Sequence, residues 1–176
     1  MFSDVEYRIK RKNKILFSHD SQCLKSLFDL VMQQSHKVLI MWALDGATSI
    51  LPQLEAKYIG ETRFSECIEL SERWATGDIK MKQAKQAILD VHAIAKTLDD
   101  QEMVALCHAI GQACSTVHVK THAIGLVLYE LTSIVLKYDK AHYQEAVIDK
   151  INDYHQKLIY WSNNPNVEQR IWAKFL

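Results

Sequence analysis

The sequence predicts an all-α protein: a single-domain bundle or short α-superhelix of about six or seven helices. Of its 176 residues, 48% are hydrophobic and 24% are charged, which is typical of a globular domain with one closed core. Only five Gly and two Pro are available for the turns that β-folds require. Apolar residues also recur at spacings of three and four along most of the chain, which is the pattern of helices facing a core.

The first two helices are predicted from apolar faces and one cap. Residues 20–34 place their leucine, phenylalanine and valine side chains on one helical face. Ser35 can cap a second helix over residues 36–58. Pro52 lies inside this second helix, and we expect it to kink or interrupt the helix because proline removes a backbone donor.

A third helix begins after Gly60, with Thr62 as its cap, and ends at Gly77, which suits the left-handed position that follows a helix. Asp78 is expected to cap a fourth helix, whose apolar period is the clearest in the sequence. Its stripe consists of Met81, Ala84, Ile88, Val91, Ala95 and Leu98.

A fifth helix is predicted to begin at Asp99, which can form a capping box with Glu102, and to end near Val117. After a short turn over residues 118–121, a sixth helix runs to Tyr138. Helices without a charged face are usually buried on all sides. We therefore expect the fifth and sixth helices at the centre of the bundle.

A seventh helix opens at Asp139 and ends at the Asn-Asn-Pro of residues 163–165. One of its sides is apolar and carries Val147, Ile148, Ile151, Tyr154, Leu158 and Trp161. The single domain, residues 1–176, thus consists of an N-terminal basic arm at 1–19, a helical core at 20–163 and a tail at 164–176. Because the tail contains Ile171, Trp172 and Phe175, we expect it to dock on the core.

Charge and cysteine usage restrict the classes of partner. The 21 Lys and Arg balance the 21 Asp and Glu, so the whole molecule has no field that would hold nucleic acid or an anionic membrane. The basic run consists of Arg8, Lys10, Arg11, Lys12 and Lys14, and acidic residues flank it, so a solvated arm is favoured over a nucleic-acid site. The start lacks the apolar run of a secretory signal. Four cysteines without a CxxC pair, at positions 23, 67, 107 and 114, indicate reduced thiols in a cytoplasmic protein.

His118 and His122 are the most suggestive candidates for chemistry. On a helix, their spacing of four would place both imidazoles on one face, as in zinc and iron sites. The HExxH pattern is absent because Val119 follows His118. Packing histidines are favoured, and whether the pair lies on a helix or a turn stays open. The alternative is a metal-dependent hydrolase or thiol transferase, whose third ligand would come from His36, His92, His142 or His155.

Asp45 lies on an otherwise apolar helix, near Trp42. A buried carboxylate needs a partner, and we expect a histidine or Arg73 to supply it. A salt bridge that locks two helices together is favoured over an acid–base role.

Several motifs are spread over residues 36–136. They are Trp42 with Asp45, Trp74 and Ala75 with Gly77, Gly111-Gln112-Ala113, and His118 with His122. In this order they resemble the immunity-protein-five-like proteins of bacterial toxin systems, with looser similarity in the last long helix. The resemblance implies an α-helical cytoplasmic protein that binds and neutralises a cognate toxin protein. It supplies no catalytic residue and no cofactor.

A protein inhibitor needs a rigid surface with aromatic or arginine anchors. The candidates near the C-terminus are Tyr160, Trp161, Arg170 and Trp172. An acidic row could steer a basic nuclease toward the protein, although a solvated helix face is the simpler interpretation; it consists of Glu61, Glu66, Glu69 and Glu72. Homo-oligomerisation stays open.

Overall fold

The computed structural model describes residues 1–138, 142–166 and 169–176. Within these residues the protein contains eight α-helices and no strand, so the all-α class is confirmed and the expected count of about six or seven is slightly low. The helices are α1 (Ser3–Lys10), α2 (Lys25–Met32), α3 (His36–Lys57), α4 (Arg63–Thr76), α5 (Met81–Ala95), α6 (Gln101–Ser115), α7 (His122–Lys137) and α8 (Tyr143–Asn163), with a 3-10 turn η1 (Gln22–Leu24) before α2.

The additional helix is α1, which forms in the segment that the sequence indicated to be a solvated arm. Phe2 and Val5 are buried, and acidic residues in the first turn and basic residues in the last turn suit the helix dipole. The loop that follows is also attached to the core. Phe17 is buried, and the backbone N–H of Leu16 donates to Oγ1 of Thr132 at 3.0 Å.

The second predicted helix is confirmed as α3, and Ser35 caps it by accepting from the backbone N–H of Val38. Pro52 was expected to kink or interrupt this helix, and it does not interrupt it, because α3 continues to Lys57. The missing donor costs one backbone hydrogen bond, but Ile50 and Leu54, on either side of the proline, are fully buried. This packing keeps the chain helical through Pro52.

Two of the predicted helix caps are wrong by one or a few residues. Gly77 has the expected left-handed φ of 87°, but α5 begins only after Lys80, and Asp78 does not cap it. The cap of α6 is Asp100 and not Asp99, because Oδ1 of Asp100 accepts from the backbone N–H groups of Glu102 and Met103. The predicted start of the seventh helix, Asp139, lies outside the described residues.

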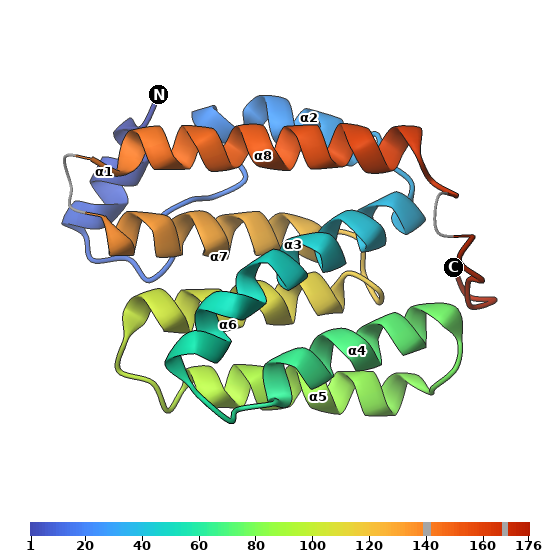
Figure 1. Ribbon diagram of the computed structural model, residues 1–176. Helices are drawn as coiled ribbons and strands as arrows, with labels where there is room; N and C mark the ends of the chain where they lie inside the picture. The colour runs from blue at the N-terminus through green and yellow to red at the C-terminus, as the bar shows by residue number, and fades with distance from the viewer. Residues whose placement is uncertain (139–141, 167–168) are drawn as a thin grey trace.

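The helices stack in layers, with α3 crossing them at an angle (Figure 1). α6 packs between α7 and α5, and α4 lies against α5. On the other side, α8 covers α7 and α2 lies along α8. Because α3 contacts α4, α6, α7 and α8, it joins the two ends of the stack. No helix in the described residues is long and apolar enough to cross a membrane.

The C-terminal tail contacts α4. The backbone N–H of Ala173 donates to the carbonyl oxygen of Ala75 at 2.9 Å, and Ala173 is buried. The ring of Phe175 lies 5.6 Å from that of Trp74, whereas Ile171 is 81% exposed.

Candidate functional site

Trp42 and Asp45 fasten α3 to α8. The indole N–H of Trp42, which is fully buried, donates to the carbonyl oxygen of Tyr154 at 3.1 Å. One carboxylate oxygen of Asp45 accepts from Nζ of Lys157 at 2.9 Å, and the other accepts from the indole N–H of Trp161 at 3.0 Å. These three bonds give both residues a structural role.

The expected partner of Asp45 was therefore wrong. Arg73 lies on α4, where its guanidinium faces Glu69 at 3.6 Å. The sequence could not indicate Lys157 because the pairing depends on how α3 crosses α8, more than 100 residues further along the chain.

Trp74 and Gly77 hold the C-terminal tail and the turn before α7. The Trp74 ring is stacked on His118, with the ring centroids 6.0 Å apart. A Cβ added at Gly77 would meet Cβ of Ala173 at 3.4 Å. Gly77 thus both ends α4 and leaves room for the tail to lie against it.

The Gly111-Gln112 pair joins α6 to α5 and α7. A Cβ at Gly111 would lie only 2.5 Å from Cε1 of His92, so the glycine lets an imidazole lie directly on the α6 backbone. Oε1 of Gln112 accepts from Nδ1 of His122 at 2.7 Å. A Cβ at Gly125 would lie 2.4 Å from the same Oε1, so Gly125 makes room for this amide.

The His92 ring also bonds to His108, with the two Nδ1 atoms 2.9 Å apart. One Nδ1 must carry a hydrogen and the other must be bare, so the two rings cannot both be protonated while this bond is kept. Burial, followed by the charges of His108 and His122, lowers the pKa of His92 to about 4. Burial likewise lowers the pKa values of His108 and His122. The cluster is therefore neutral near pH 7.

His118 and His122 do not share a helical face. His118 lies in the turn before α7, and His122 is the first residue of α7. His118 is stacked on Trp74 and His122 is bonded to Gln112. Over residues 1–138, 142–166 and 169–176, no three His, Cys, Asp or Glu side chains are grouped as metal ligands.

Comparison with known protein families finds a match. A family model described as Imm-5 like putative immunity protein matches residues 29–157. The chain belongs to this family. No curated protein and no solved structure matches the chain. The immunity-protein match contains all the motif residues and leaves α1, the following loop and the tail outside it.

Within this immunity-protein fold, a buried ionic network was missed by the sequence analysis. Glu130 of α7 is only 4% exposed, and its carboxylate contacts Nζ of Lys150 at 2.9 Å and the hydroxyl of Tyr154. Lys150 also contacts Asp153 at 3.2 Å. Burial raises the pKa of Glu130 in spite of the lysine. The only signal in the sequence was a single glutamate on a helix without a charged face.

The four cysteines of the chain are all free thiols. Burial raises the pKa of Cys107 to about 12 and that of Cys23 to about 11. Thiols with such raised pKa values are poor nucleophiles at neutral pH, as the sequence indicated for Cys107.

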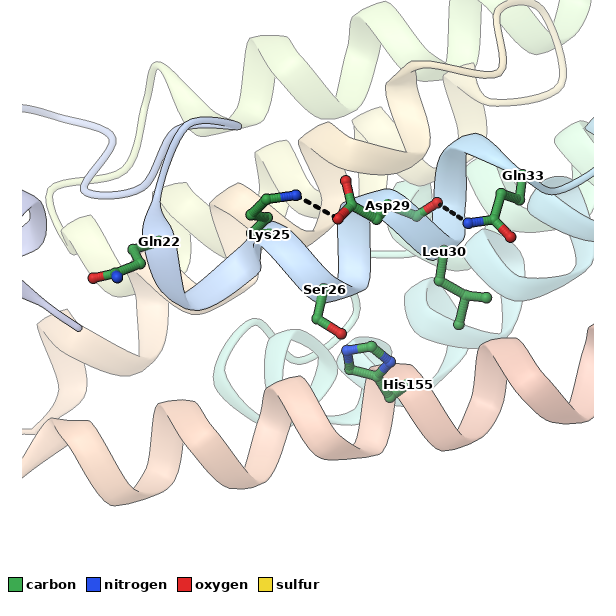
Figure 2. Close-up of a pocket in the computed structure, with 7 residues that line it drawn as sticks. All are labelled: Gln22, Lys25, Ser26, Asp29, Leu30, Gln33 and His155. Atoms are coloured by element: carbon green, nitrogen blue, oxygen red, sulfur yellow. Dashed lines mark hydrogen bonds and ion pairs between the residues drawn. The ribbon is translucent and has the colours of Figure 1, made fainter.

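The surface near α2 and α8 holds a wide depression of about 600 Å³. Figure 2 shows that its exposed side chains pair along α2, where Lys25 contacts Asp29, and that His155 faces Ser26 from α8. His155, one of the suggested third metal ligands, therefore lies away from the histidines of α5, α6 and α7.

The suggested binding anchors are only partly available. Trp161 is 8% exposed and bonded to Asp45, so it is not a surface anchor, whereas Tyr160 is 48% exposed. Nζ of Lys37 and Cζ of Arg170 lie 5.8 and 5.7 Å from the centroid of the Trp172 ring. In the acidic row, Arg63 pairs with Glu61 and Arg73 faces Glu69, and these contacts weaken its field.

Proposed function

We propose that the protein neutralises a bacterial toxin by binding it directly, as an immunity protein without catalysis of its own. The observation that carries the proposal is membership of the immunity-protein family over residues 29–157. The motif residues support a binding role, because each of them holds helices, a turn or the tail together. Such a scaffold is rigid, and rigidity is what an inhibitory surface needs.

The enzyme alternative assigns His118 and His122 to a metal. The contacts favour packing instead, because the ring of His118 is stacked on Trp74 and the Nδ1 atom of His122 donates to Gln112. The two hypotheses therefore predict different results for a variant of the exposed residue His118.

In the first step of the test, the tagged protein is expressed in its native host and purified. Any protein that stays bound to it in stoichiometric amount is then identified. The captured partner is then expressed in a test strain with and without this protein. We expect the partner to arrest growth alone and the immunity protein to restore growth, with a stable complex of the two purified chains. Absence of a stoichiometric partner, or a partner that does not arrest growth, would contradict the proposal.

The variant His118→Gln separates binding from catalysis. We expect it to protect cells as well as the wild-type protein does, provided that its urea midpoint is close to the wild-type value. Loss of protection by a folded variant that still binds the toxin would favour the enzyme.

A further inference from the structure

A groove lies where α7 ends and α6 begins, beneath the loop that follows α1. It has two halves, of about 440 and 500 Å³, which meet at Lys14 and Gln101. The first half reaches His108 and Tyr129, and the second reaches Leu136 and Tyr138. We refer to the two halves together as the basic groove. In Figure 1 the loop, coloured blue, runs beside this end of α7.

The charged side chains that line the basic groove are all positive. They are Lys12, Lys14 and Lys96, and the described lining contains no Asp or Glu. No ion pair among the described residues engages these three lysines. The positive charge also acts inside the groove. Burial lowers the pKa of His108 most, and the charges of Lys14 and Lys96 lower it further. Because the whole chain has a net charge of +0, this positive charge is local to the groove.

The remaining lining is largely apolar. Ile9, Leu16 and Val135 form part of the second half. Leu136 and Tyr138, on the same side, are 43% and 45% exposed. Apolar groups with a charged rim are typical of a surface that binds protein, whereas a nucleic-acid site would need more phosphate contacts than three lysines provide.

The wall that carries two of the lysines is held in place by the core. Leu16 and Phe17 are buried, Leu16 donates to Thr132, and the Arg8 guanidinium donates to Ser18 at 3.0 Å. Lys12 has a left-handed φ of 55°, which turns the chain out of α1. A wall fixed in this way loses little entropy when a partner binds.

We infer that the basic groove binds an acidic segment of the toxin, with carboxylates of that segment meeting Lys14 and Lys96 and its apolar side chains covering Leu136 and Tyr138. This inference rests on the proposed function, because it identifies the surface through which the immunity protein holds its toxin. Carboxylates would pair with lysines that no ion pair among the described residues engages.

The test uses the toxin captured by the wild-type protein, purified and titrated against variants of the full chain. In the groove variant, Lys14→Glu and Lys96→Glu are combined. The matched control combines Lys82→Glu and Lys85→Glu, which change the net charge equally on the exposed face of α5. We expect the dissociation constant of the toxin complex to be at least tenfold larger for the groove variant, and to change less than twofold for the control. Circular dichroism and urea unfolding check that both variants fold, and Lys14→Gln with Lys96→Gln replaces the groove variant if it does not.

A photo-reactive benzoylphenylalanine at position 101 identifies the occupant. A crosslink to a toxin peptide with more Asp and Glu than Lys and Arg supports the inference. Crosslinks to a basic peptide, to nucleic acid or to a second copy of this chain overturn it. If the toxin binds both charge variants with wild-type affinity, the inference fails while the proposed function stands; if the wild-type protein captures no toxin, both fail.

Discussion

Close contacts explain why particular residue types occupy the family motifs. The motif residue Gly111 lies in α6, and Gly125, which is outside the motifs, lies in α7; glycine within a helix costs about 1 kcal/mol relative to alanine. Alanine would nevertheless be worse at both positions, because its Cβ would clash with the His92 ring or with the Gln112 amide. At the residue scale, the motif therefore encodes how closely α5, α6 and α7 approach one another.

The substitution Gly111→Ala tests this explanation. An added Cβ at 2.5 Å from His92 Cε1 must displace a ring that is also bonded to His108. We expect a loss of about 1–3 kcal/mol in the free energy of unfolding, which is typical of overpacking, measured by urea denaturation.

The control is the same substitution in a His92→Ala background. There the clash is absent, and the gain in helix propensity of about 1 kcal/mol should make Gly111→Ala neutral or stabilising. An equal loss in both backgrounds would show that the His92 ring is not what the glycine accommodates.

The stability of the protein should also report the protonation of His92. Its pKa is about 4 in the folded protein, against 6.5 as the ordinary value. Because the folded pKa is lowered, the stabilisation is fully present above pH 6.5 and is lost as the pH falls toward 4. The slope for one proton is at most about 1.4 kcal/mol per pH unit, and it is smaller here because the ring is partly exposed to solvent.

Urea denaturation at several pH values in this range measures the effect. The variant His92→Gln should lose less stability than the wild-type protein between pH 6.5 and 4, since it has no imidazole to protonate. Parallel pH profiles for the two proteins would contradict the assignment.

At the scale of helices, α8 is attached by polar bonds to two neighbouring helices, α3 and α7. Asp45 of α3 binds Lys157 and Trp161, and Glu130 of α7 binds Lys150. A buried ion pair contributes little net stability, but breaking it leaves an uncompensated charge. These bonds therefore specify how α8 lies on its neighbours more than they stabilise it.

The substitution Lys150→Met should destabilise the protein by about 3–5 kcal/mol near neutral pH, because Glu130 then loses its cation. The loss should be smaller near pH 5. Without the lysine, the pKa of Glu130 rises further above its unfolded value, so the stability lost to its ionisation appears only as the pH rises. Thermal or urea unfolding at both pH values measures this difference.

The double variant Lys150→Met with Glu130→Gln serves as the control. It should recover most of the lost stability, because no buried charge is left. A double variant as unstable as the single one would mean that the lysine acts through packing alone.

For the whole molecule, the motif residues and the proposed binding surface are separate. Trp42, Asp45 and Gln112 are used in internal contacts. The basic groove combines the loop after α1, outside the family match, with α6 and α7, inside it. A family scaffold with a wall supplied by a segment outside the match suits the proposed role, in which one toxin is recognised specifically.

The sequence by itself determined the all-α class, most of the helix boundaries and the family. These depend on local information: the period of apolar residues, the Ser35 cap, the glycine at position 77 and the order of the motifs. The basic segment before α2 was misjudged because an eight-residue helix with so many charges is not recognisable from its period. It is held by the burial of Phe2 and Val5, which no local pattern indicates.

Only the tertiary structure decided the partners of the polar residues. Asp45 pairs with Lys157, His92 bonds to His108, and Glu130 pairs with Lys150. None of these contacts follows from spacing along the chain. The physical reason is that a helix period states which face is buried, whereas the pairing of side chains depends on the crossing angles and offsets of packed helices. The basic groove has the same origin, because its lysines and apolar side chains come from segments that only the folded chain brings together.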